Sequence, residues 1–225
     1  MITISLIKQY DKVAEDYFRL KTQFFKEKED RATKYLFKAL PNLENKVVLD
    51  FGCGFGYTIK KLERRKAKKI YGIDTSKVML NKAKEVLKNS NNLFLENIEK
   101  THFKDNTFEI IYSRFSLHYL KSFTKAYNEI HRILKKKGVL VLVVSHPIMN
   151  LLNKKELNYF DQEIFDTKVY HNKMTVKFPS HTFKDYFSKT FFKNFRLIDL
   201  MESTLTSIGS KSNLPGVLVI KAKMM

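Results

Sequence analysis

The residue types and spacing that best suit chemistry occur in one glycine-rich segment, Leu49–Gly56 (LDFGCGFG). A turn of this kind between a strand and a helix brings bare backbone close to a ligand. A dinucleotide would need the spacing G-x-G-x-x-G, but this segment reads G-x-G-x-G, and Tyr57 stands where the third glycine belongs. Asp50 at the mouth of the loop would repel a pyrophosphate and attract an ammonium or sulfonium group. The loop therefore favours a cationic ligand over NAD or a flavin dinucleotide.

A second acid follows about two dozen residues later, where Asp74 ends the run Lys69–Asp74 (KIYGID). A carboxylate at the end of the second strand of a nucleotide-binding α/β fold can accept both hydroxyls of a ribose. Glycine in a tight turn can be purely structural. The combination is more specific, because the glycine spacing is accompanied by two acids, each at the end of a predicted strand. It indicates a positively charged adenosyl ligand.

Two histidines are candidates for general acid or base chemistry. His118 lies in Ser116–Tyr119 (SLHY), and His146 follows the apolar run Gly138–Ser145 (GVLVLVVS). Both come just after predicted strands, whose carboxyl ends form the ligand-binding edge of such sheets. Each histidine also has a purely structural interpretation. His118 could pack against the ligand without taking part in the reaction, and His146 could be a turn residue before Pro147.

These residues must be positioned by alternating strands and helices, which predict βαβ units and a parallel sheet. Strands are expected at 46–50, 69–74, 92–96, 108–113, 138–145, 195–202 and 216–222, and helices within 4–40 and at 57–66, 77–89, 122–135 and 182–193. Ser76 is a plausible N-cap, and Leu40-Pro41 should end the first helical region. The predicted fold class is α/β with a doubly wound sheet.

The chain is expected to form a single domain of 225 residues. Residues 1–40 would form a helical cap, 46–146 the cofactor-binding core, 147–181 a lid or substrate insertion, and 182–225 a C-terminal helix and strands. The segment 147–181 shows no convincing alternating pattern, and a stretch of this kind is usually a lid, a binding loop or disorder.

Composition narrows the class of protein further. The net charge of +19 could mark a nucleic-acid surface, but only 7 of 42 basic residues are arginine and the lysines are spread along the whole chain. We therefore favour a solvated surface. One cysteine, Cys53, excludes an intrachain disulfide and a multi-cysteine zinc site, and we expect no metal. No apolar run is long enough to span a membrane, and the start is a poor signal peptide, so a cytoplasmic protein is expected.

Four segments together resemble the class I methyltransferases that use S-adenosylmethionine, in the type 11 small-molecule group. They read VLDFGCGFG, GIDTSKVMLNKAKE, FKDNTFEIIYSRFSLHYL and EIHRILKKKGVLVLVVSHP, and the similarity is strong over about 8–146. The resemblance implies a mostly parallel, seven-stranded, Rossmann-like sheet whose last strand is antiparallel. It also implies S-adenosylmethionine as the cofactor and S-adenosylhomocysteine as the product.

The resemblance further implies roles by position. The three glycines would line the methionine part, Asp50 would organise its amino end, Asp74 would bind the ribose, and Met79 would pack near the adenine. Asn97 stands where most members have Asp, and its amide oxygen could equally accept from the adenine amino group. The expected cofactor-binding residues are Tyr10, Tyr17, Asp50, Gly52, Cys53, Gly54, Gly56, Asp74, Thr75, Met79, Asn97, Ile98 and Ser113. The tyrosines could shield a sulfonium by cation–π contact or serve ordinary core packing.

The acceptor pocket is expected from residues 1–25, 113–119 and 146–181. Candidate substrate-binding residues are Phe115, Tyr119, His171, His181 and Glu202. The predicted function is methyl transfer to a small-molecule acceptor by a monomer or homodimer without membrane contact. Two alternatives stay open: an RNA-modifying methyltransferase, suggested by the charge, and a non-catalytic, cofactor-binding partner protein.

Overall fold

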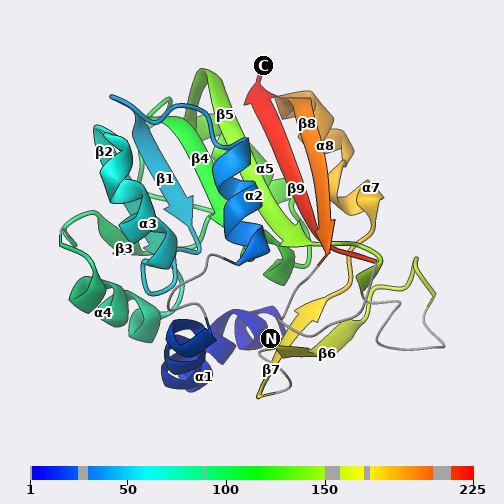
Figure 1. The fold of residues 1–225 in the computed structure, drawn as a ribbon. Helices are drawn as coiled ribbons and strands as arrows, with labels where there is room; N and C mark the ends of the chain where they lie inside the picture. The colour runs from blue at the N-terminus through cyan, green and yellow to red at the C-terminus, as the bar shows by residue number, and fades with distance from the viewer. Residues whose placement is uncertain (1, 25–29, 89, 150–157, 170–172, 205–213) are drawn as a thin grey trace.

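The computed structural model describes residues 2–24, 30–88, 90–149, 158–169, 173–204 and 214–225. A seven-stranded sheet has the order β3-β2-β1-β4-β5-β9-β8 (Figure 1). Its strands are β1 (Val47–Phe51), β2 (Lys69–Asp74), β3 (Leu93–Leu95), β4 (Phe108–Arg114), β5 (Leu134–Ser145), β8 (Phe195–Thr204) and β9 (Pro215–Met224). The first five pair in parallel, whereas β9 is antiparallel to both β5 and β8. The predicted sheet with an antiparallel last strand is confirmed.

The helices of the described residues begin and end near the predicted boundaries. They are α1 (Ile2–Phe24), α2 (Arg31–Ala39), α3 (Tyr57–Leu62), α4 (Lys77–Val86), α5 (Thr124–Ile133), α7 (Phe183–Tyr186) and α8 (Lys189–Asn194), with short 3₁₀ turns η1 (Glu63–Arg65) and η2 (Leu117–Tyr119). Ser76 caps α4 as predicted, by accepting the N–H of Met79 at 3.1 Å. The helix predicted over 182–193 is divided in two, because Ser188 caps a second helix. None of these helices is long and apolar enough to cross a membrane.

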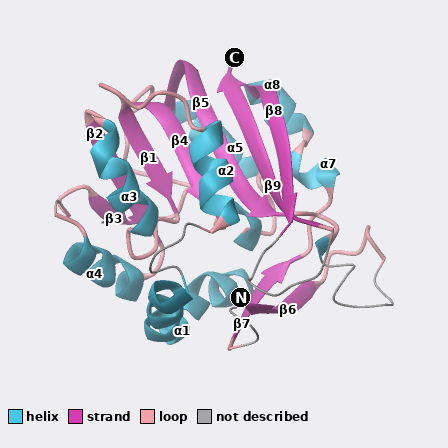
Figure 2. Ribbon diagram, in the orientation of Figure 1, coloured by secondary structure: helices cyan, strands magenta, loops and turns pink. Residues whose placement is uncertain are grey.

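The two faces of the sheet are both covered, as a doubly wound fold requires (Figure 2). Strand β5 shows the pattern most clearly. Leu142 and Val144 pack in the cluster that includes α5 and α8, whereas Val141 and Val143 pack in the cluster that includes α2. Successive side chains of a strand point to opposite faces, so a strand buried on both faces is apolar at every position. This explains the unbroken apolar run in the sequence.

The segment 147–181 contains regular structure that the sequence analysis missed. Within it, β6 (Ile164–Val169) and β7 (Met174–Pro179) pair antiparallel in a hairpin separate from the main sheet (Figure 2). From Met174 to Phe178 every second side chain is buried. The expectation of no alternating pattern was therefore wrong. The alternation covers only five residues, which is too short a run to stand out among polar neighbours.

Helix α1 and the β6–β7 hairpin lie together at the end of the sheet where the parallel strands finish (Figure 1). Leu20 of α1 shares an apolar cluster with Met174, Val176 and Phe178 of β7. The other side of α1 contacts α4. The first helix is thus held between the hairpin and the Rossmann-like core.

Candidate functional site

A cavity lies at the carboxyl ends of β1 to β4 and is covered by α1. Strand ends of this kind are where open α/β sheets bind ligands. Its wall comprises Leu6, Tyr10, Tyr17, Phe51, Gly52, Gly54, Ile73, Asp74, Thr75, Met79, Glu96, Asn97, Ile98, Arg114, Phe115, Ser116, Leu117, Tyr119 and Leu120. The predicted residues that it brings together are Tyr10, Tyr17, Gly52, Gly54, Asp74, Thr75, Met79, Asn97, Ile98, Phe115 and Tyr119. The wall includes no described residue of 146–181, although that segment was expected to form part of the acceptor pocket.

The three glycines of the loop have different neighbours. A β-carbon on Gly54, whose φ is 55°, would meet nothing within 4 Å, so its missing side chain leaves open space at the cavity wall. A β-carbon on Gly52 would stand 1.8 Å from Oγ of Ser116. One on Gly56 would stand 2.7 Å from the side chain of Leu87. Gly56 is not among the wall residues, and its close neighbour Leu87 ends α4.

Asp74 holds the glycine loop and also faces the cavity. Its Oδ2 accepts the backbone N–H of Gly54 at 2.8 Å, and its Oδ1 accepts that of Ser76 at 2.9 Å. Burial raises the pKa of the Asp74 carboxyl, and these N–H donors oppose the rise. Each carboxylate oxygen has a further lone pair. The acid can therefore still accept hydroxyl groups from a ligand in the cavity.

Three other predicted cofactor residues lie behind the wall. Asp50 is 2% exposed, and burial raises the pKa of its carboxyl to about 8, against the opposing effect of the Tyr112 phenol. Cys53 packs in an apolar cluster with Ile59, and burial raises the pKa of its thiol. Ser113 is fully buried. Asp50 therefore lies behind the loop instead of at its mouth, and Cys53 and Ser113 are not among the wall residues.

Helix α1 is docked over the cavity by polar contacts at both of its sides. The side-chain amide of Gln9 pairs with the backbone of Lys177 in β7, donating to its carbonyl at 2.7 Å and accepting its N–H at 2.8 Å. Asp11 accepts the hydroxyl of Ser76 at 2.5 Å. The same serine caps α4 beside Asp74. Helix α1 is therefore tied both to the β6–β7 hairpin and to the segment that carries Asp74.

Aromatic side chains cover the cavity between the Gln9 contact and the Asp11 contact of α1. The hydroxyls of Tyr10 and Tyr119 are 2.6 Å apart, and the rings of Tyr10 and Tyr17 meet edge to face at 5.4 Å. Tyr17 also contacts the ring of Phe55 in the glycine loop, at 5.9 Å. Both predicted tyrosines thus line the cavity and pack among themselves, which is compatible with either role considered for them.

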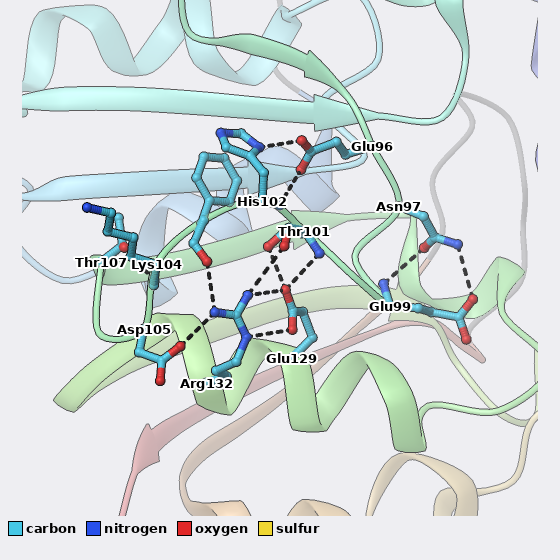
Figure 3. Close-up of polar contacts among 11 residues, drawn as sticks. Glu96, Asn97, Glu99, Thr101, His102, Lys104, Asp105, Thr107, Glu129 and Arg132 are labelled. Atoms are coloured by element: carbon cyan, nitrogen blue, oxygen red, sulfur yellow. Dashed lines mark hydrogen bonds and ion pairs between the residues drawn. The ribbon is translucent and has the colours of Figure 1, made fainter.

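The loop after β3 is held by an ion-pair network around Arg132 of α5 (Figure 3). Arg132 donates to Glu129 at 2.6 Å, to Asp105 at 2.7 Å and to the carbonyl of Phe103 at 2.8 Å. Glu129 in turn accepts the backbone N–H of Thr101 at 2.7 Å. The network anchors the part of the loop that follows the cavity residues at 96–98.

Two polar side chains of that loop line the cavity. The Glu96 carboxylate pairs with the His102 ring, and Oδ1 of Asn97 accepts the N–H of Glu99 at 3.1 Å (Figure 3). The amide nitrogen of Asn97 donates to the Glu99 carboxylate, also at 3.1 Å. An adenine amino group at this place would share the Asn97 oxygen with a backbone donor.

Phe115 follows β4 in a strained conformation. Its φ is 56°, in the left-handed region that bulky residues rarely adopt and that costs about 1–3 kcal/mol. Its N–H donates to the carbonyl of Val143 at 2.8 Å, which holds the turn in place. This turn places Ser116 against Gly52 and Phe115 at the cavity wall.

A buried ionic cluster beside the cavity was not foreseen from the sequence. Lys21 of α1 and Arg114 at the end of β4 both donate to Oδ2 of Asp30, at 2.6 and 2.7 Å. Asp30 caps α2 with its other oxygen, which accepts the N–H of Thr33 at 2.7 Å. The cluster ties two helices to a strand end, and Arg114 lines the cavity.

His118, a predicted catalytic residue, is not among the wall residues and is buried behind them. The residue is 2% exposed, and the centroid of its ring is 4.8 Å from that of Phe178. Its backbone carbonyl is 3.0 Å from Nε2 of His181. Burial lowers the pKa of His118 to about 3 and that of His181 to about 4. Both imidazoles are therefore neutral at pH 7, and the 3₁₀ turn directs His118 toward the hairpin.

His146 and Glu202, predicted for catalysis and substrate binding, form a pair away from the cavity. Nε2 of His146 is 2.6 Å from the Glu202 carboxylate, and Nδ1 accepts the N–H of Ile148 at 3.3 Å. The ring is 2% exposed and packs against Phe183. The pair joins the end of β5 to β8. His171 lies outside the described residues.

Further wall residues escaped the sequence analysis: Leu6, Phe51, Ile73, Glu96, Arg114, Ser116, Leu117 and Leu120. Most adjoin a predicted residue at a strand end. Glu96 already ends the predicted strand 92–96, and extending the predicted strand 108–113 by one residue would have reached Arg114. Leu6 had no such signal, because it reaches the cavity only through the docking of α1.

The doubly wound sheet, the glycine loop and the acid after β2 define a nucleotide-cofactor-binding α/β domain. Residues 49–142 match the Methyltransf_11 family, described as a methyltransferase domain. Residues 49–142 thus match a methyltransferase domain, and the fold is that of S-adenosylmethionine-dependent methyltransferases, as the sequence resemblance predicted. The fold is also that of an S-adenosylmethionine dependent methyltransferase from Mesorhizobium loti, with a TM-score of 0.72, 20% identity, and coverage of 84% of this chain and 96% of that chain.

Curated relatives act on different kinds of acceptor. The chain is 32% identical over 125 residues to the malonyl-[acyl-carrier protein] O-methyltransferase of Buchnera aphidicola, covering 55% of this chain and 49% of that one. It is 27% identical over 181 residues to the tRNA U34 carboxymethyltransferase of Helicobacter pylori, covering 75% and 64%. The chain spans 27% to 65% of the length of the curated relatives that it matches.

Proposed function

We propose that this chain transfers a methyl group from S-adenosylmethionine to a small-molecule acceptor and leaves S-adenosylhomocysteine. The observation that carries the proposal is the contact between Gly54 and Asp74 on one cavity wall. Open backbone space lies there beside a half-buried carboxylate, at the carboxyl edge of a parallel sheet. This combination fits an adenosyl group whose ribose hydroxyls need acceptors and whose chain must pass close to the backbone.

The sulfonium supplies an activated methyl group, and its in-line displacement needs alignment more than covalent help from the protein. In this chain Asp74 would hold the ribose, and the backbone of Gly52 and Gly54 would border the amino acid part. Tyr10 and Tyr17 would exclude water from the reacting atoms. Because neither His118 nor His146 reaches the cavity, we assign proton removal to neither of them.

The exposed lysines of the described residues do not gather into one RNA-binding face, which favours a small acceptor. Lys12, Lys121 and Lys177 lie on the cavity side, and others lie at the opposite edge of the sheet, where β1, β2 and β5 begin: Lys46, Lys68, Lys69, Lys136 and Lys137. RNA binding depends on cationic contacts to phosphates, which would be needed together on one face around the reacting group. In addition, α1 covers the cavity, so a large acceptor would have to displace it.

Calorimetry tests the cofactor first. S-adenosylmethionine and S-adenosylhomocysteine should both bind, whereas NAD should not. Binding of NAD without binding of either adenosyl ligand would overturn the proposal. The glycine spacing and the acidic wall are the reason for this expectation.

A transfer assay with methyl-labelled cofactor then tests the acceptor. We expect label in the small-molecule fraction of a metabolite extract and none in total tRNA. Label in tRNA, with binding that weakens steeply as salt rises, would favour the RNA alternative. Cofactor binding without transfer to either fraction would favour the non-catalytic partner protein.

A further inference from the structure

The charges on the cavity wall are separated along the sheet. The acids Asp74 and Glu96 lie at the ends of β2 and β3, whereas Arg114 lies at the end of β4. Strand β1 with its glycine loop stands between β2 and β4. Since neighbouring strands are about 4.8 Å apart, the ends of β2 and β4 lie about 10 Å from each other. The cavity thus has an acidic end and a cationic end with bare backbone between them.

The guanidinium of Arg114 is held in place by a group that is itself buried. Its Nη2 donates to Oδ2 of Asp30 at 2.7 Å, and the side chains of Arg114 and Asp30 are 11% and 8% exposed. Burial alone would raise the pKa of the Asp30 carboxyl, but the charges of Arg114 and Lys21 hold it well below its ordinary value. A buried partner whose carboxyl stays ionised at ordinary pH therefore orients Arg114 beside the cavity.

Two cations share that one carboxylate oxygen. Lys21 reaches the same Oδ2 from α1, and burial together with the charge of Arg114 lowers the pKa of its amine to about 7. The like-charge repulsion between Lys21 and Arg114 would be relieved by an anion at the cavity wall. A planar guanidinium matches a carboxylate in particular, because two of its N–H groups can donate in parallel.

We propose that Arg114 binds the carboxylate at the amino acid end of the adenosyl ligand, with Asp30 as its positioning residue. The inference rests on the proposed function. An adenosyl ligand whose ribose lies at Asp74 extends across the glycine loop toward β4, where Arg114 stands. Lys21 brings α1 to the same carboxylate, so the subsite is completed only when the helix is docked over the cavity.

The test compares two ligands that differ in one group, S-adenosylmethionine and decarboxylated S-adenosylmethionine, by calorimetry on the full chain. Arg114→Met should weaken binding of S-adenosylmethionine by roughly ten- to a hundredfold, the usual effect of losing a hydrogen bond to a charged group. Binding of the decarboxylated ligand should change less than twofold. Arg65→Met removes the same charge from an exposed site on η1 and should change neither affinity.

Thermal unfolding must first show that Arg114→Met is folded. A second variant tests the inference if it is not. Arg114→Lys keeps a cation beside Asp30 but loses the paired donors. It should weaken binding of S-adenosylmethionine by a smaller factor than Arg114→Met does, and leave binding of the decarboxylated ligand unchanged. Equal loss for both ligands, or no loss for either, would overturn the inference and leave the proposed function standing. Failure of the unaltered chain to bind either ligand would overturn the proposed function and, with it, this inference.

Discussion

Oγ of Ser116 lies 1.8 Å from the point where a β-carbon on Gly52 would stand. The turn after β4 and the loop after β1 therefore touch through a position that only glycine can occupy. The strained backbone of Phe115, next to Ser116, is part of the same contact. The loops after β1 and β4 both line the cavity, and the position of each depends on its contact with the other.

This contact predicts different consequences for two neighbouring glycines. Gly52→Ala should lower the free energy of unfolding by several kcal/mol or prevent folding, because Ser116 has to move. Gly54→Ala has open space, so its effect on stability should be limited to about 1–2 kcal/mol of backbone strain at positive φ. Its added methyl group enters the cavity and should weaken binding of S-adenosylhomocysteine. Denaturant unfolding and calorimetry separate the two effects, and equal stability of both variants would contradict the assignment.

Asp74 is predicted to hold the ribose through lone pairs that the backbone leaves available. Asp74→Ala should weaken binding of S-adenosylhomocysteine by about 1–3 kcal/mol, the usual effect of removing a buried polar partner. Asp74→Asn keeps the shape and one acceptor oxygen and should lose less. Calorimetry measures both, with Asp199→Ala on the exposed edge strand β8 as a control. An unchanged dissociation constant for Asp74→Ala would show that this acid does not contact the ligand.

The Gln9 amide is predicted to keep α1 docked on β7. Gln9→Ala removes both bonds to the Lys177 backbone, so α1 should open more often and S-adenosylhomocysteine should dissociate several-fold faster. Gln23→Ala, at an exposed position of the same helix, controls for the change in helix propensity. Hydrogen exchange of α1 amides and stopped-flow dissociation provide the measurements. Identical α1 exchange in the two variants would refute the docking role.

Stability should depend on pH through His118 and His181. Burial lowers their pKa values to about 3 and about 4, so between these values and the ordinary value near 6.5 the unfolded chain binds protons that the folded chain does not. The free energy of unfolding should therefore fall as pH decreases from about 6.5 to about 4, with each histidine contributing a slope of about 1.4 kcal/mol per pH unit.

Replacing either histidine isolates its share of that slope. His118→Phe and His181→Phe should each flatten the pH dependence in this window, because phenylalanine cannot titrate. Denaturant unfolding at several pH values measures the difference from the unaltered chain. This comparison also cancels the opposite contribution of Asp50, whose raised pKa favours the folded state as pH falls. A slope unchanged by both substitutions would mean that neither imidazole is neutral in the folded chain.

Local patterns in the sequence were sufficient for the core of the domain. The apolar runs that become β1, β4 and β5 are buried on both faces, so their character does not depend on distant partners. Ser76 as a helix cap and Asp74 at a strand end follow from neighbours within a few residues. The glycine spacing likewise reflects a turn whose conformation is decided locally.

The histidines show where local reasoning stops. His118 and His146 do follow strand ends, as predicted, but a strand end specifies only the edge of the sheet and not the direction of the next side chain. The 3₁₀ turn η2 directs His118 toward Phe178, and the pairing of β8 with β9 brings Glu202 to His146. Both outcomes depend on segments more than 50 residues away.

The sequence by itself determined a Rossmann-like core whose residues 49–142 match a methyltransferase domain, because strand periodicity, glycine turns and terminal acids are short-range features. Only the tertiary structure decided what closes the cavity. Lys21, Asp30 and Arg114 meet from α1, the start of α2 and the end of β4, and Gln9 meets Lys177 across 168 positions. Such contacts carry no local pattern, since each partner alone is an ordinary polar residue and the pairing exists only once the helices have packed on the sheet.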